Sequence, residues 1–143
     1  MKLERLMAFG VYGCVGITTE VFFTAFYPFF ADGYSSELMG LRGHSYVWMY
    51  LIYGSASVLF PFGFRIMNKR HLLIRALAYG LAILGVELVS GAMLRALLGA
   101  CPWEYQEGWH FDGLIRYDYL PLWMVFGLGL EGIHRFNKRV GFA

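Results

Sequence analysis

The feature that most constrains this chain is a set of four apolar segments separated by polar links. They run from about residue 6 to 30, 47 to 67, 77 to 100 and 116 to 133. A helix needs about 20 apolar residues to cross the hydrocarbon core of a bilayer. The first three segments reach that length directly. The fourth is clearly apolar only from about residue 120 to 133, and it approaches that length only if residues 115–119 contribute. The pattern predicts an all-α fold, a polytopic membrane helix bundle with four transmembrane helices.

The composition agrees with a membrane location and argues against other classes. Hydrophobic residues make up 58% of the chain and charged residues only 15%, whereas soluble domains carry about 25% charged residues. The net charge of +2 comes from dispersed basic residues, unlike the concentrated basic surface of a nucleic-acid binder. With no linker and no internal repeat, we expect a single transmembrane domain over residues 1–143. The first apolar segment lacks a small-residue cleavage motif, so we interpret it as a retained helix.

The distribution of Lys and Arg predicts the orientation. Nine of the twelve basic residues fall on one side of the predicted helices. They precede the first helix, link the second to the third and follow the fourth: Lys2, Arg5, Arg65, Lys69, Arg70, Arg75, Arg135, Lys138 and Arg139. By the positive-inside rule both termini are then cytoplasmic, in a multi-pass protein of the plasma (inner) membrane.

The link between the third and fourth helices is rich in acidic and aromatic residues. Pro102 cannot continue the third helix and marks its end. Gly108 and Gly113 interrupt the residues that follow. Because Trp and Tyr favour the headgroup level, we expect this link to form an ordered cap or a short interfacial helix on the non-cytoplasmic side.

Three charged residues are expected inside the apolar segments. Glu87 lies near mid-membrane, Arg95 lies about 12 Å farther toward the non-cytoplasmic face, and Glu20 lies between them in depth. An intramembrane carboxylate is costly and marks an ion or substrate path by default. We therefore predict a polar cavity, open to the non-cytoplasmic side, that these three residues face. The alternative is a structural ion pair with one additional, protonated carboxylate.

Further binding residues are predicted on the non-cytoplasmic side, where Arg can grip a phosphate bidentately and aromatic rings suit the interface. The set consists of Arg42, Trp103, Glu104, Tyr105, Arg116 and Tyr119. Near the cytoplasmic interface, Glu131 lies beside His134 and Arg135, which predicts a salt bridge there.

Small residues recur where the helices are expected to touch. Close backbone approach in lipid needs small side chains, so we interpret these residues as packing contacts. They are Gly10, Gly13 and Gly16 in the first helix, Gly80, Ser90 and Gly91 in the third, and Gly127 and Gly129 in the fourth.

No cofactor or metal is expected. The chain has no Gly-x-x-x-x-Gly-Lys-[Ser/Thr] loop, no His-Glu-x-x-His helix and no Gly-x-Ser-x-Gly elbow. The four histidines are scattered and show no metal-ligand spacing. The chain is therefore not expected to bind ATP itself.

Several motifs taken together resemble a known family. In residues 13–26 Glu20 precedes an aromatic-rich Thr-Ala stretch. The other motifs are Val47-Trp48, Ile52-Tyr53-Gly54, Glu87, Gly91, Arg95, Cys101-Pro102-Trp103-Glu104-Tyr105, Gly113-Leu114-Ile115, Tyr119, Trp123 and Glu131. In order and spacing they resemble the transmembrane protein 229 family of animals, and they are similar to a bacterial family described as ABC-transporter type IV membrane proteins. The resemblance implies a polytopic membrane protein, and the transporter description implies that an ATPase would be a separate chain.

Three functions are compatible with these patterns. The first is a small transporter or channel-like permease subunit, in which Glu20 and Glu87 bind a cation or proton and Arg95 binds an anionic group or the carboxylates. It calls for a homo-oligomer or a partner subunit. The second is a membrane-embedded enzyme or binding protein for a lipid headgroup, with Glu87 or Glu104 as acid or base. The third is a scaffold or assembly subunit whose buried charges specify one packing. Membrane lipids are expected partners in each case.

Overall fold

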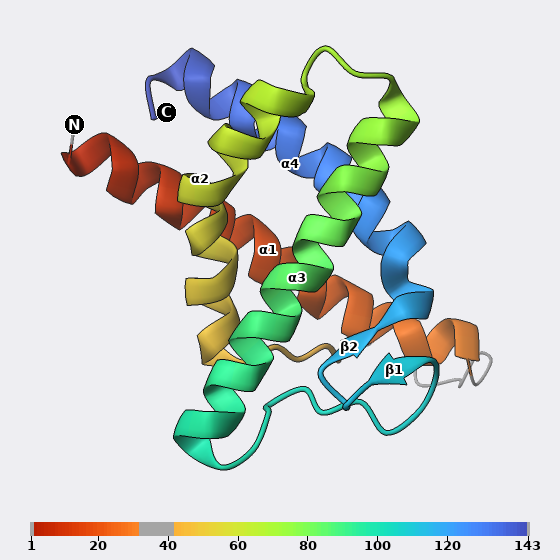
Figure 1. Ribbon diagram of the computed structural model, residues 1–143. Helices are drawn as coiled ribbons and strands as arrows, with labels where there is room; N and C mark the ends of the chain where they lie inside the picture. The colour runs from red at the N-terminus through yellow and green to blue at the C-terminus, as the bar shows by residue number, and fades with distance from the viewer. Residues whose placement is uncertain (1, 32–41, 143) are drawn as a thin grey trace. The chain divides into compact units, whose positions relative to one another are not determined.

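The computed structural model describes residues 2–31 and 42–142, and its main elements are four helices (Figure 1). In chain order they are α1 (Lys2–Ala31), α2 (Val47–Met67), α3 (Leu72–Leu98), β1 (His110–Phe111), β2 (Ile115–Arg116), the 3₁₀ helix η1 (Tyr117–Tyr119) and α4 (Leu120–Val140). The chain divides into two compact units within α2. The first unit runs to Val58 and includes Phe142, and the second runs from Leu59 to Gly141.

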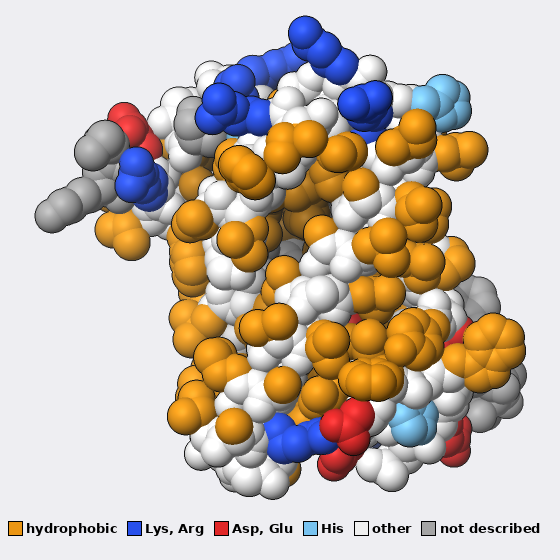
Figure 2. Space-filling view, viewed as in Figure 1, with side chains coloured by type: hydrophobic (Ala, Val, Ile, Leu, Met, Phe, Trp, Pro, Cys, Tyr) orange, Lys and Arg blue, Asp and Glu red, His pale blue; other side chains and the backbone are white. Residues whose placement is uncertain are grey.

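Three of the helices are long and apolar enough to cross a membrane. The candidate spans are Leu3–Tyr27, Val47–Met67 and Leu72–Leu98. Hydrophobic side chains cover α2 and α3 in Figure 2, as expected for surfaces that face lipid. In the same view Lys and Arg gather where α2 ends and α3 begins, whereas acidic side chains appear at the other end of α3.

The fourth helix differs from the predicted fourth span and is not among these candidates. Residues 115–119 form β2 and η1 instead of a first helical turn, so α4 begins at Leu120, with Pro at its first turn. It then continues past the predicted end at residue 133 to Val140, through a stretch that includes Arg135, Lys138 and Arg139. The added residues are charged, and they make α4 less apolar than the other three helices.

The ends of α3 have local causes. The helix begins at Leu72, earlier than predicted, because Nδ1 of His71 accepts a hydrogen bond from the backbone N–H of Leu73 (3.4 Å). This places Arg75 within the first turns of the helix. At the other end, Gly99 adopts φ 80° and donates its N–H to the carbonyl of Arg95.

Small residues allow the two main helices of the second unit to approach closely. A Cβ added to Gly127 of α4 would lie 2.5 Å from Cβ of Tyr79 on α3, and one added to Gly80 would lie 2.9 Å from Cγ of Met124. Gly129, in contrast, has no neighbouring atom within 4 Å. Packing of α3 on α4 therefore depends on Gly80 and Gly127, and the predicted packing role does not extend to Gly129.

The first unit repeats this arrangement between α1 and α2. A Cβ on Gly13 would lie 2.7 Å from the ring of Tyr50, and one on Gly16 would lie 2.2 Å from the ring of Tyr53. A helix face with small residues therefore receives large aromatic rings from its neighbour.

Residues 99–119 form a hairpin segment rather than part of an all-α fold. In β1 and β2, His110 pairs with Arg116 and Phe111 with Ile115, in antiparallel register. Asp112 (φ 51°) and Gly113 (φ 68°) form the turn, and the N–H of Leu114 donates to the carbonyl of Phe111 (2.9 Å). Two successive residues with positive φ are typical of a hairpin turn, and an Asp-Gly pair adopts them readily.

Candidate functional site

The hairpin segment contacts α3 through Glu87, the carboxylate at the middle of the apolar helix. The hydroxyl of Tyr105 donates a hydrogen bond of 2.7 Å to Oε1 of Glu87. Both side chains are half-buried. A charged group in an apolar helix thus receives a donor from the segment that follows the helix.

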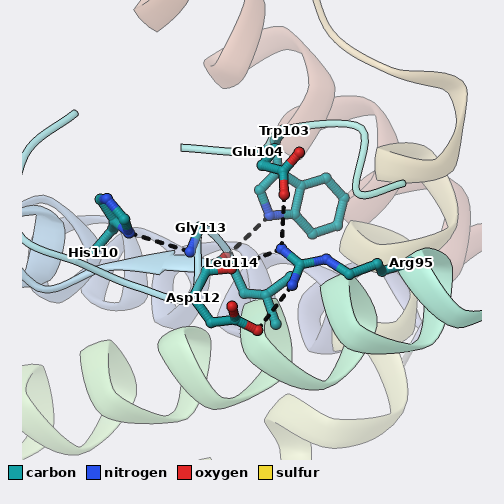
Figure 3. A network of polar contacts seen from close by, with 7 residues as sticks. All are labelled: Arg95, Trp103, Glu104, His110, Asp112, Gly113 and Leu114. Carbon is teal, nitrogen blue, oxygen red and sulfur yellow. Dashed lines mark hydrogen bonds and ion pairs between the residues drawn. The ribbon is translucent and has the colours of Figure 1, made fainter. Parts of the chain in front are cut away.

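A second contact joins the hairpin segment to the last turns of α3 (Figure 3). Arg95 donates from Nη1 to a carboxylate oxygen of Asp112 (2.8 Å), and from Nη2 to the carbonyl of Asp112 (2.7 Å) and to Glu104 (3.1 Å). The turn itself is held by His110, whose Nδ1 accepts from the N–H of Gly113 (3.2 Å). Arg95 is therefore matched by two carboxylates of the hairpin segment rather than by Glu87.

Trp103 anchors the start of the same segment. Its indole N–H donates to the carbonyl of Leu114 (3.2 Å), and a Cβ on Gly91 would lie 3.3 Å from its ring. Gly91 thus leaves room for the indole against α3. Trp103 packs and positions the segment, and no ligand role follows from these contacts.

Arg116 and two tyrosines form the remaining part of the site. Arg116 donates to both carboxylate oxygens of Asp118, with Nε at 3.0 Å, and from Nη1 to the hydroxyl of Tyr119 (3.0 Å). Its guanidinium lies 4.1 Å from the ring centre of Tyr119 and 5.9 Å from that of Tyr105. Hydrogen bonds from Arg116 lower the pKa of Asp118 below its usual value.

These contacts link Glu87, Arg95, Glu104, Tyr105, Asp112, Arg116, Asp118 and Tyr119, which we call the outer network. It contains two arginines and four carboxylates. Each arginine is already paired with a carboxylate. Since carboxylates outnumber arginines, the network as a whole has an excess of acidic groups. Such a charge distribution suits a proton or cation better than an additional anion.

The structure brings together seven of the nine predicted binding residues. They are Glu87, Arg95, Trp103, Glu104, Tyr105, Arg116 and Tyr119, all in the second unit. Glu20 and Arg42 belong to the first unit. There Glu20 interacts with the hydroxyl of Tyr53 and lies near His44, whereas Arg42 is exposed. A cavity shared by Glu20, Glu87 and Arg95 remains a prediction.

The predicted set did not include Asp112, although this residue pairs with Arg95. Asp112 carries a signal that predicts its place: an Asp-Gly pair between short hydrophobic stretches favours a hairpin turn.

A second set of polar contacts lies between α3 and α4. Glu131 accepts hydrogen bonds from Arg75 (3.0 Å) and Arg135 (2.9 Å) and a longer one from the hydroxyl of Tyr79 (3.4 Å). With His134 and Asn137, which lie on the same face of α4, these residues form what we call the inner network. The predicted pairing of Glu131 with Arg135 is present, and Arg75 joins it from a position 56 residues earlier.

Within residues 2–31 and 42–142, no three His, Cys, Asp or Glu side chains group as metal ligands. Both cysteines are free thiols, and burial raises the pKa of Cys101. These observations leave the two polar networks as the candidate functional regions of the second unit.

No protein-family model matches the chain, and no solved structure matches it. The contacts described above are therefore the basis for assigning a function.

Proposed function

We propose that this protein is a small integral membrane permease subunit that moves protons or another small cation, with Glu87 as the ion-binding group. The observation that carries the proposal is the half-buried Glu87 carboxylate in an apolar helix, hydrogen-bonded to Tyr105 of the hairpin segment. An ionisable group at such a position is costly, and it marks an ion path by default. The contacts of Arg95 with Glu104 and Asp112 hold the hairpin segment on the same helix.

The distribution of charge supports a membrane orientation for this arrangement. Lys and Arg gather where α2 ends and α3 begins (Figure 2), as expected of a cytoplasmic end. In the proposed orientation both termini are cytoplasmic, α4 crosses the membrane as a fourth span, and the hairpin segment forms a cap on the other side. The outer network then faces the non-cytoplasmic compartment.

The pairing of the arginines favours a cation over a phosphate as the ligand. A free guanidinium would grip a phosphate bidentately, but Arg95 already pairs with Glu104 and Asp112, and Arg116 with Asp118. A phosphate would have to displace these carboxylates. The paired arginines therefore favour a permease over a lipid-headgroup protein. The resemblance to the transmembrane protein 229 family is also a hypothesis, and the permease proposal does not rest on it.

The test is ion flux into liposomes that contain the purified protein and a pH-sensitive dye. We expect Glu87→Gln to reduce proton or cation flux at least tenfold while the protein keeps its helical circular dichroism. Glu107→Gln is the matched control, because Glu107 is an exposed glutamate of the same hairpin segment and lies outside the outer network. Equal flux in the wild type and Glu87→Gln would remove the basis of the proposal.

A scaffold or assembly subunit is the second candidate, and one observation favours it. The charge of Arg95 is paired with two carboxylates of the same chain, as expected for a contact that fixes one packing. A scaffold predicts that Glu87→Gln lowers stability and that the wild type shows no flux. The two candidates therefore give opposite results in the same liposome assay.

The permease proposal also predicts assembly, because a four-helix chain offers few surfaces to line a path. A homo-oligomer or a separate partner subunit, such as an ATPase, would complete it. Native mass spectra from mild detergent distinguish the possibilities. A dimer or larger without a lipid adduct supports the permease. A monomer that retains one lipid, and loses it in Glu87→Gln, supports a headgroup site instead.

A further inference from the structure

The inner network contains a stripe of buried polar side chains that the proposed ion site does not use. Glu131, His134 and Asn137 follow at intervals of three, so they lie along one face of α4. Their exposed fractions are only 5%, 5% and 0%. Along α3, Tyr79, which contacts Glu131, precedes Glu87 by eight residues, or about 12 Å of helix. Along α3 the stripe therefore begins about two turns of helix from Glu87, toward the end of α3 that carries Arg75.

The first member of the stripe is matched. Glu131 accepts from Arg75, Arg135 and Tyr79, and its side chain is 7% exposed. These three donors fix the orientation of the Glu131 carboxylate.

The other two members are buried without hydrogen-bond partners. Nδ1 of His134 has none, and neither has Nδ2 or Oδ1 of Asn137. The His134 imidazole packs against two rings of α2, with centroids 6.0 Å from Phe60 and 4.8 Å from Phe64. Buried polar atoms in folded proteins are matched by protein groups or by ordered water. An amide needs both a donor and an acceptor here, and a water molecule supplies both.

We propose that bound water joins His134 and Asn137 along the buried face of α4, and that this hydrated stripe is a proton-relay station between Glu87 and the cytoplasmic end of the protein. The inference rests on the proposed function and specifies its ion as the proton. In a transfer, a hydrated proton reaches the bound water, which donates a proton to Nδ1 of neutral His134. The imidazolium then gives the proton on its other ring nitrogen to water at the cytoplasmic end, and only O–H and N–H bonds form and break.

The charges around His134 are suited to this role. Glu131, Arg135 and Lys138 lie near it on α4, Arg75 and Tyr79 approach from α3 through their contacts with Glu131, and α2 contributes the rings of Phe60 and Phe64. The anionic Glu131 stabilises a transient imidazolium, whereas the nearby cations oppose a permanent one. A station of this kind accepts a proton and releases it again.

The test combines infrared spectroscopy with proton flux. Bound water is detected by O–H stretching bands that shift when the sample is exchanged into H₂¹⁸O. Asn137→Leu replaces the amide with an apolar group of similar size, and Asn68→Leu is the matched control at the only other asparagine of the chain. We expect Asn137→Leu to lose an ¹⁸O-sensitive band that Asn68→Leu keeps, and to lower proton flux at least tenfold.

A second variant keeps the proposal testable if Asn137→Leu does not fold. His134→Gln can hold water but cannot carry a proton, so we expect it to keep the band and to lose flux at least tenfold. Identical ¹⁸O-sensitive bands in the wild type and Asn137→Leu, or full flux in His134→Gln, would overturn the relay. A wild type that carries another cation but no protons would overturn the relay and leave the permease proposal in place. A wild type without any ion flux would end both, while the band would still decide whether the stripe holds water.

Discussion

The two polar networks of the second unit use the same residue types in different surroundings. In the outer network, Arg95 pairs with carboxylates that are 46% and 67% exposed. In the inner network, Arg75 and Arg135 pair with Glu131, whose side chain is 7% exposed. Exposed ion pairs contribute little because water and salt screen them. A buried carboxylate that loses its charge leaves its partners uncompensated. The inner network should therefore control stability, and the outer network should be able to open at low cost.

The largest expected effect follows from removing the buried charge. Glu131→Gln keeps the size of the side chain but leaves Arg75 without an ionic partner, and we expect a loss of about 3 kcal/mol in the free energy of unfolding. Denaturation by SDS in mixed micelles measures it. Glu107→Gln is the control for a glutamate that is exposed. A loss of unfolding free energy no larger than that expected for an exposed ion pair would contradict the proposed difference in stability between the two networks.

The next effect concerns the close approach of the helices that carry the inner network. Gly127→Ala would place its Cβ 2.5 Å from Cβ of Tyr79, so α3 and α4 must shift, and we expect a cost of about 1–3 kcal/mol. Gly129→Ala is the matched control two residues along the same helix, where nothing lies within 4 Å. The same denaturation assay should show Gly129→Ala at or slightly above wild-type stability. Equal effects of the two alanines would contradict the packing described for Gly127.

A smaller effect is expected at the outer network. Asp112→Asn removes one of the two carboxylate charges that pair with Arg95, and Asn tolerates the positive φ of this position. We expect a loss of about 1 kcal/mol or less, shrinking further in high salt. Unfolding measured at low and high ionic strength provides the check. If the loss were independent of salt and as large as that of Glu131→Gln, the outer network would contribute to stability as much as the inner network does.

The smallest effect is a pH dependence at the edge of the outer network. Hydrogen bonds from Arg116 lower the pKa of Asp118 in the folded protein. The pair therefore adds stability above the unfolded pKa of about 3.9, and this stability is lost as the pH falls through the lower folded value. Subtracting the acid unfolding profile of Asp118→Asn from that of the wild type should isolate this component. A difference that grows as the pH falls would have the wrong sign.

Much of the helical fold could be predicted from the apolar segments, and the bounds of α2 are the predicted ones. The ends that differ depend on single local contacts. The imidazole of His71 starts α3 earlier than the apolar pattern suggests. The hairpin that follows the Asp112-Gly113 turn takes residues 116–119, which the prediction gave to the fourth helix, into β2 and η1. Because hydrophobic periodicity reports the middle of a helix, it contains no information on such caps and turns.

The binding residues were predicted as a set, but their partners were not. Glu87 and Arg95 stand out because charge is rare in an apolar helix. The partners of Arg95 come from a segment whose path depends on one turn, and Arg75 meets Glu131 across 56 residues. The spacing of residues along a helix does not predict either of these pairings. The depth of a charged residue along a helix can be estimated from the sequence. That depth does not identify the residue of opposite charge that pairs with it.

The separation of these contacts along the chain has a consequence for the order in which the protein assembles. The outer network closes over 9 to 18 residues between Glu87 and Asp112, and a hairpin forms within about 1–10 μs. At a synthesis rate of about 5–20 residues per second, this end of α3 can close before α4 leaves the ribosome. Arg75 must wait seconds longer for Glu131. During that interval α3 has one end closed, while Arg75 at its other end still lacks the carboxylate that it pairs with in the folded protein.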